Sequence, residues 1–255
     1  MVRVGAAILC GGRGERLRPL TDFFQKTMIP IGPKKRPLLE YIVRLLAYHG
    51  VKDVTMLTSY RTQEISAYFK DGSSFGVTIG YSRDREGAKG SLNAVANAIG
   101  SGSIPPCDVL LIYYGDVLSD LNVRELISVH EGQRADATLV LARGYRLPVG
   151  VAEVEGRARV VAMKEKPTLD VSVTTGCMTL GPTAMKLAVE QAGRTRTDLM
   201  THFVPYLLKR RARVAAYYTK GLWYDVGTVA SYEKLNAELK DDTVQFARKA
   251  TKPKP

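Results

Sequence analysis

The chain has 255 residues, of which 45% are hydrophobic and 24% charged, so it can bury one sizeable core. No apolar run reaches the ~20 residues that a membrane helix needs, and we expect no membrane association. The net charge of +12 raises the question of nucleic acid. However, four basic residues lie in the last eight positions, and no basic helix carries interleaved aromatics, so we expect no nucleic-acid partner.

Strand-like and helix-like segments alternate through the first half of the chain. Apolar runs predict strands at 6–10, 54–58, 77–81 and 109–114. Helical spacing of apolar residues predicts helices at 38–49, 63–69, 91–99 and 121–130. This alternation predicts a mostly parallel, three-layer α/β sheet. Ligands of such sheets bind beyond the carboxyl ends of the strands, so we expect the functional site at that edge.

The second half is richer in strands. We predict strands at 137–142, 149–154, 159–163, from 179 onwards and at 214–218. Helices are predicted at 182–191, 199–209 and from 228 to about 239. The strand-rich part is an insertion that could form a lobe over the sheet edge. We expect one domain over residues 1–240 and a basic tail over 241–255 whose end is disordered.

A glycine-rich segment follows the first predicted strand. It contains Gly11, Gly12 and Gly14, followed by Arg16, and Lys26 lies ten residues further on. Glycines let backbone N–H groups close on a bulky anion, because no side chain intervenes and positive φ costs little. The spacing fits neither a P-loop nor a dinucleotide fingerprint. We therefore predict a polyphosphate cradle of another kind.

Two aspartates stand where carboxylates are unusual. Asp116 ends the apolar strand at 109–114, and Asp225 follows an aromatic pair just before the last helix. Near a polyphosphate, two such carboxylates suit Mg²⁺, which takes one or two protein carboxylates and completes its shell with phosphate oxygens and water. Each aspartate alone would be interpreted as a turn or cap residue. Together with the glycine segment, they favour a metal site.

A charged pair, Glu165 and Lys166, closes the predicted strand at 159–163 and is followed by Pro167, which stops strand pairing. One interpretation is a solvated turn. The other gives Lys166 a phosphate and Glu165 a sugar hydroxyl.

The three cysteines, Cys10, Cys107 and Cys177, are scattered and lack the spacing of metal ligands. We interpret them as small core residues, and their sparse, odd number fits a reducing cytoplasm.

Together these motifs resemble the sugar-1-phosphate nucleotidyltransferases, also called nucleotide-sugar pyrophosphorylases. The resemblance covers roughly the first 240 residues and rests on the segments 11–30, 87–92, 115–116, 150–151, 165–167, 175–176 and 223–228. It implies a Rossmann-like sheet with a strand-rich sugar-binding insertion. It also implies that an NTP and a sugar 1-phosphate give an NDP-sugar and pyrophosphate, by in-line attack on the α-phosphorus with Mg²⁺ as cofactor. Many relatives continue into hexapeptide repeats, which are absent here, so we expect the catalytic domain alone.

The resemblance assigns roles to individual residues in four groups. These are catalytic Arg16, Lys26 and Lys166; nucleotide-binding Gly11, Gly12, Gly14, Asp84 and Gly87; sugar-binding Gly150, Glu165, Thr175 and Gly176; and Mg²⁺-binding Asp116 and Asp225.

Some positions depart from the family pattern. Gln25 and Thr27 flank Lys26 where prolines are common, which predicts a less rigid loop. Thr174 stands where an asparagine facing the sugar is frequent, so the sequence leaves the sugar open. Asp84 lies near the expected base-reading position, where a carboxylate suits the N1–H and N2–H₂ donors of guanine.

Two alternatives remain open from sequence. One is a non-catalytic relative that binds a nucleotide or sugar nucleotide and regulates a partner. Such proteins usually lose the charged site residues, all of which are present here. The other is the nucleic-acid binder, which leaves the glycine segment without a role. Self-association into a homo-oligomer is left open.

Overall fold

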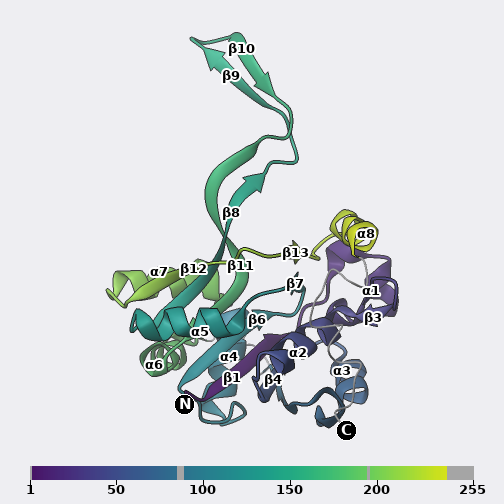
Figure 1. Ribbon diagram of the computed structural model, residues 1–255, viewed down its shortest axis with the longest axis vertical. Coiled ribbons are helices and arrows are strands. Elements are labelled where there is room, and N and C mark those ends of the chain that lie inside the picture. The colour runs from purple at the N-terminus through teal and green to yellow at the C-terminus, as the bar shows by residue number, and fades with distance from the viewer. Residues whose placement is uncertain (1, 85–88, 194–195, 240–255) are drawn as a thin grey trace.

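The computed structural model describes residues 2–84, 89–193 and 196–239. Within them, the centre is a seven-stranded sheet in the order β12-β8-β11-β6-β1-β4-β5 (Figure 1). These strands are, in that order, Val214–Tyr218, Ala137–Arg146, Thr168–Leu180, Val109–Tyr114, Val4–Leu9, Asp53–Thr58 and Thr78–Arg83. Neighbouring strands pair in parallel except β11, which runs antiparallel to β6 and β8. The mostly parallel α/β sheet predicted from the sequence is confirmed.

Side chains of the central strands alternate between two cores, as the period of two in a strand requires. On β1, Ala6 and Ile8 belong to one core and Ala7 to the other. On β6, Leu111 and Tyr113 join the core of Ile8. Both faces of the sheet are therefore buried, which explains why these strands are continuous apolar runs.

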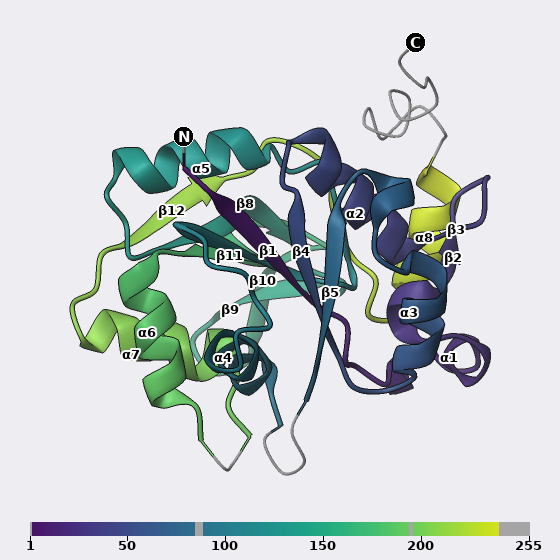
Figure 2. The same cartoon turned by 90° about the horizontal axis from the view of Figure 1, so that it is seen from below.

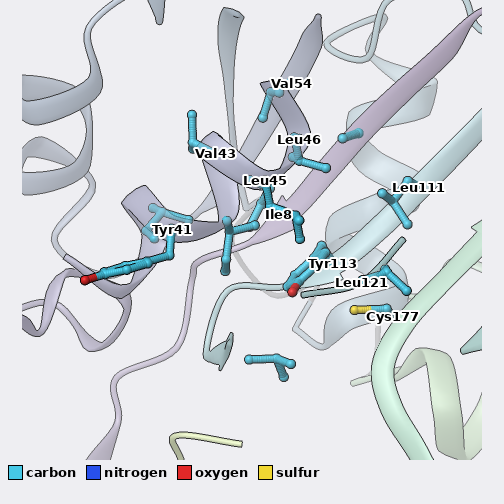
Figure 3. Packing of buried hydrophobic residues seen from close by; sticks show 14 of the residues in the cluster. Ile8, Tyr41, Val43, Leu45, Leu46, Val54, Leu111, Tyr113, Leu121 and Cys177 are labelled. Atoms are coloured by element: carbon cyan, nitrogen blue, oxygen red, sulfur yellow. The ribbon is translucent and has the colours of Figure 1, made fainter. Parts of the chain in front are cut away.

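Helices cover both faces (Figure 2). The first core receives side chains from α2 (Leu38–Tyr48), α3 (Thr62–Phe69) and α5 (Val123–Gly132). The second receives them from α4 (Ser91–Gly100), α6 (Pro182–Gln191) and α7 (Val204–Lys209). Figure 3 shows Leu45 and Leu46 of α2 facing Ile8 of β1. The predicted helix at 199–209 begins instead as a π-helical turn, Leu199–Phe203, that leads into α7.

Several short elements have no period long enough to be recognised in the sequence. They are α1 (Leu20–Phe23), β2 (Pro30–Ile31), β3 (Arg36–Pro37), β7 (Val117–Ser119) and β13 (Trp223–Asp225). The last two pair in an antiparallel ribbon. Helix α8 (Val229–Glu238) follows this ribbon and begins with a capping box in which Thr228 and Ser231 bond reciprocally.

The strand-rich insertion forms an arm rather than a compact lobe. β8 and β11 pair beyond the helices, and the chain between them forms a hairpin of β9 (Val151–Glu155) and β10 (Arg159–Lys164) that extends from the body (Figure 1). Strand β11 begins at Thr168, whereas the sequence predicts a strand only from residue 179. Most residues of β11 before Thr175 are exposed, so this part is a strand through its pairing with β8 and not through burial.

One face of the hairpin carries ion pairs, and the other carries apolar side chains. Glu153 and Glu155 form ion pairs with Lys164 and Arg159, at 3.6 and 3.7 Å. Strand register places Val154 and Val160 opposite each other and Met163 opposite Ala152. Met163 is 71% exposed and Val160 59% exposed.

The start of α4 depends on a glycine. Gly90 has φ +105°, and a Cβ there would lie 2.2 Å from the Thr197 carbonyl oxygen. Thr197 N–H donates to the Lys89 carbonyl at 3.0 Å, and the Asp198 carboxylate accepts from Ser91 N–H at 3.1 Å. The segment before α7 therefore packs directly on the backbone at Gly90 and caps the helix.

We predict that Gly90→Ala lowers the free energy of unfolding by about 3 kcal/mol, because it adds positive-φ strain to a clash with backbone. Chemical denaturation of the purified protein measures this. Gly132→Ala is the matched control, since a Cβ at Gly132 meets nothing within 4 Å, and its effect should stay within about 1 kcal/mol. Equal stability of Gly90→Ala and wild type would contradict the packing described here.

Candidate active site

Three segments with predicted site residues leave the sheet at the carboxyl ends of parallel strands. The glycine loop follows Leu9 of β1, Asp116 lies two residues beyond the end of β6, and Asp84 follows β5 directly. β1 and β6 are neighbours, with Leu9 opposite Tyr114. The glycine loop and Asp116 therefore start side by side, at the edge where ligands of parallel sheets bind.

Gly14 closes the glycine loop on the segment that carries Lys26. Its φ is +69°, and a Cβ there would lie 2.7 Å from Thr21 Cγ2 and 3.0 Å from Lys26 Cβ. The Thr21 hydroxyl donates a 2.9 Å hydrogen bond to the Gly14 carbonyl. A side chain would open this turn. Gly14 also precedes the 3-10 turn that contains Arg16.

Gly11 and Gly12 lie between two charged residues. A Cβ at Gly11 would lie 3.4 Å from Asp84 Oδ2 and 3.1 Å from Ser59 Cβ. At Gly12 the nearest neighbour would be Lys26 Cδ, at 3.9 Å. The loop therefore has Asp84 on one side and Lys26 on the other, with open backbone between them.

The β7–β13 ribbon brings the two predicted metal ligands together. Asp225 ends β13 opposite Val117, the residue after Asp116. Val226 N–H donates a 2.9 Å hydrogen bond to the Asp116 carbonyl. On the side of β1, Gly115 allows the chain before Asp116 to lie close to the end of β1, since a Cβ at Gly115 would lie 2.8 Å from the Leu9 carbonyl oxygen. Two carboxylates separated by more than a hundred residues in sequence thus become neighbours.

Cations accompany both carboxylates. The Lys26 ammonium forms an ion pair with Asp116, and both side chains are largely buried. A Cβ at Gly227 would lie 3.1 Å from Asp225 Oδ1 and 3.3 Å from Arg16 Nη2, so both side chains border the space that a side chain at Gly227 would fill. The structure therefore gathers Arg16, Lys26, Asp116 and Asp225 in one cluster.

The pKa of Asp225 reflects this cluster. Partial desolvation, and then the Asp116 carboxylate, raise the pKa of Asp225 above its ordinary value, while Lys26 and Arg16 lower it. Burial and the neighbouring carboxylate thus disfavour the ionised form of Asp225, whereas the two nearby cations favour it. Paired carboxylate oxygens are hard donors of the kind that Mg²⁺ takes. Within the described residues no cluster of three or more His, Cys, Asp or Glu side chains gathers, so this donor set is a pair.

Asp84 lies on the opposite side of the glycine loop. Burial raises the pKa of its carboxyl group, and a hydrogen bond with Ser59 lowers it. Its backbone N–H donates to the Thr58 carbonyl at 3.0 Å, which fixes the residue to the end of β4. The neighbouring predicted nucleotide-binding residue, Gly87, lies outside the described residues.

The structure places Gly150, Glu165 and Lys166 together at the base of the hairpin. A Cβ at Gly150 would lie 2.9 Å from Glu165 Oε2, and Lys166 Nζ lies 3.9 Å from Glu165 Oε1. The Glu165 side chain is 67% exposed and that of Lys166 53%. Among the described residues, no hydrogen bond or ion pair links this group to the cluster at Asp116.

Thr175 and Gly176 form a bulge in β11, where the pairing with β8 shifts register. Thr175 is buried and its hydroxyl donates to the Val140 carbonyl at 3.0 Å. The Trp223 indole N–H donates to the Thr175 carbonyl at 2.9 Å, and Gly176 has φ +76° against Tyr114. The bulge therefore supports the strand that carries Asp225, and its hydroxyl is already engaged.

Gln25 and Thr27 are the residues that sequence reasoning misjudged. Their departure from proline predicts a less rigid loop around Lys26, yet both are buried, at 0% and 2% exposure, and hydrogen bonded to each other. The polar residues on either side of the predicted catalytic Lys26 were the signal in the sequence that could have indicated these hydrogen bonds. Gly115 and Gly227, which permit the close approaches above, were not predicted as site residues either.

No helix among the described residues has both the length and the apolar character needed to cross a bilayer.

Comparison with known proteins identifies the family of the chain. The family model described as nucleotidyl transferase matches residues 5–242. A mannose-1-phosphate guanylyltransferase of Mycobacterium tuberculosis is 31% identical over 241 residues, covering 93% of this chain and 65% of the relative. A UTP–glucose-1-phosphate uridylyltransferase of Synechocystis is 31% identical over 186 residues, covering 67% of this chain and 46% of the relative. The chain thus spans less than two thirds of the length of these relatives.

A Bacillus anthracis protein solved in complex with a sucrose shares the fold, with a TM-score of 0.74 at 23% identity, covering 92% of this chain and 94% of that one. The match over residues 5–242 includes the glycine loop, both aspartates and the arm. The chain belongs to the nucleotidyl transferase family.

Proposed function

We propose that this protein transfers a nucleotidyl group from an NTP to a sugar 1-phosphate. The observation that carries the proposal is the convergence of Arg16, Lys26, Asp116 and Asp225 beside an open glycine loop. Two curated relatives named as sugar-1-phosphate nucleotidyltransferases support the substrate class. An oxygen of the sugar phosphate attacks the α-phosphorus, the bond to the bridging oxygen of the leaving group breaks, and pyrophosphate departs with its electrons.

In this proposal the protein acts by holding and neutralising charge. Backbone N–H groups at Gly11, Gly12 and Gly14 bind the triphosphate, and Arg16 adds a guanidinium that matches phosphate geometry. Lys26 has three N–H donors, so its bond to Asp116 leaves donors for phosphate oxygens. No covalent protein nucleophile is needed, because positioning and electrostatics supply most of phosphoryl-transfer catalysis.

We propose Asp116 and Asp225 as the residues that hold Mg²⁺. Bound there, the ion would neutralise charge on the phosphate oxygens. The adjacency of Asp225 to Asp116 supports this assignment, since it brings two carboxylates together beside the glycine loop, and partial burial and the Asp116 carboxylate both raise the pKa of Asp225.

For the sugar phosphate we propose the group at the base of the arm. Lys166 would bind the phosphate and Glu165 a sugar hydroxyl, with Gly150 leaving room beside the Glu165 carboxylate. Thr175 and Gly176 would contribute through the shape of the β11 bulge, because the Thr175 hydroxyl is occupied by the Val140 carbonyl. The cytoplasm as compartment and self-association stay predictions.

We propose guanine as the base. The Asp84 carboxylate lies beside Gly11 and can accept from the N1–H and N2–H₂ groups of guanine, which no pyrimidine presents in that pattern. The proposal rests on Asp84, since the relatives include a guanylyltransferase and, at the same identity, a uridylyltransferase.

Transfer is tested with a matrix of NTPs and sugar 1-phosphates, measuring pyrophosphate release with and without Mg²⁺. We expect release only with Mg²⁺. Asp116→Asn and Asp225→Asn should each lower kcat by at least about 100-fold, because each removes one of the two carboxylates proposed to hold Mg²⁺, the ion that would compensate charge on the reacting phosphates.

Asp53→Asn is the matched control, because Asp53 begins β4 at the opposite edge of the sheet, and its activity should equal that of wild type. Circular dichroism checks that each variant is folded. Nucleotide binding without pyrophosphate release across the whole matrix would instead support a non-catalytic binding protein.

Base selection is tested with Asp84→Asn. The amide would present an N–H donor where guanine needs an acceptor, so we expect kcat/KM for GTP to fall by about 10- to 100-fold. The value for UTP should change little. Equal loss for GTP, ATP, UTP and dTTP would show that Asp84 does not read the base.

A further inference from the structure

We propose that Gln25 is a positioning residue that holds Lys26 in place through its buried side-chain amide. The inference rests on the proposed function in one respect, namely that Lys26 binds a polyphosphate.

The two ends of the Gln25 amide bind different segments. Its Nε2 donates to the Cys10 carbonyl, and the Gly12 carbonyl lies 3.5 Å away. Its Oε1 accepts from Thr27 N–H at 2.6 Å and from the Thr27 hydroxyl at 2.7 Å. The amide orientation is determined by these partners, since Thr27 N–H can only donate and the Cys10 carbonyl can only accept. One side chain thus joins the glycine loop to the turn that contains Lys26.

The backbone of Gln25 is held independently. Its N–H donates a 2.7 Å hydrogen bond to the Glu64 carboxylate at the start of α3. Glu64 is paired with Arg61 at 3.0 Å, and Arg61 Nη2 donates to the Asp22 carbonyl at 2.8 Å. The amide is therefore attached to a backbone that is itself held in place. Its hydrogen bonds can thus fix the Lys26 turn relative to the glycine loop, in addition to filling the space between them.

Thr27 extends the connection to the carboxylate pair. A Cβ at Gly115 would lie 2.9 Å from Thr27 Cγ2, so the end of β6 packs on this methyl group directly before Asp116. Asp116 in turn receives the Lys26 ammonium. Gln25 therefore contacts the glycine loop directly and Gly115, the residue before Asp116, through Thr27. Lys26 lies between Gln25 and Thr27 in the chain.

An apolar side chain of the same length cannot replace this amide. Gln25→Met would leave the Cys10 carbonyl and the Thr27 N–H buried without their partner, which is costly and allows the Lys26 turn to shift. A purely structural role predicts lower stability with phosphate binding unchanged. A positioning role predicts that Gln25→Met weakens phosphate binding only when Lys26 is present.

The test measures binding of inorganic triphosphate by calorimetry in wild type, Gln25→Met, Lys26→Met and the double variant. This probe needs neither the base nor turnover. We expect Gln25→Met to weaken binding about tenfold, Lys26→Met to weaken it at least as much, and the double variant to equal Lys26→Met. Thr138→Val is the control, because it removes a buried hydrogen bond to His130 away from the site and should bind like wild type.

If Gln25→Met does not fold, Thr27→Val still tests the proposal. It removes the hydroxyl bond to Gln25 and keeps the backbone bond, so triphosphate binding should weaken about two- to threefold. Wild-type affinity in Gln25→Met or in Thr27→Val, additive losses in the double variant, or wild-type affinity in Lys26→Met would each overturn the proposal. The wild type and the three variants could show the expected triphosphate affinities although the protein releases no pyrophosphate. That result would refute the proposed reaction and leave the positioning role of Gln25 intact.

Discussion

The parallel pairing of β1 with β6 is the constraint on which the candidate site depends. Leu9 lies opposite Tyr114, and Gly115 N–H donates to the Leu9 carbonyl at 3.0 Å, so both chains leave the sheet at the same level. The glycine loop and Asp116 are therefore neighbours before any of their side chains interact. Because each strand is buried on both faces, a slip in register would expose apolar residues and is strongly disfavoured. The precision of the site thus comes from the core of the sheet.

Sequence reasoning succeeded where the signal was local. Continuous apolar runs predicted the central strands, helical spacing predicted α2, and the position of Asp116 after such a run placed it at the correct edge. Arg16 and Lys26 were predicted as catalytic residues and Asp116 and Asp225 as metal ligands; the structure brings the four together, and their roles stay predictions. Family matching over residues 5–242 confirms the resemblance from which their roles were taken.

The remaining features depend on contacts between distant segments, which no local pattern records. Nothing in the residues around Gln25 indicates that its amide would meet the Cys10 carbonyl, and Gly227 looks like an ordinary helix approach until Arg16 is placed beside it. The sequence predicts this strand only from residue 179, whereas the exposed part of β11 that begins at Thr168 is defined by its pairing with β8. Burial and register, which tertiary structure decides, override local propensity at these positions.

The β7–β13 ribbon also has a consequence for how the molecule assembles. Asp225 reaches Asp116 only when β13 pairs with β7, a contact of very high sequence separation. Such contacts carry a large loop-closure cost and form late, and synthesis proceeds from the N-terminus. A growing chain that has already folded β1, β4 and β6 would display the glycine loop, Lys26 and Asp116 but no second carboxylate. Both carboxylates are therefore present together only after synthesis has passed β13, so a nascent chain that ends before β13 does not present a complete site.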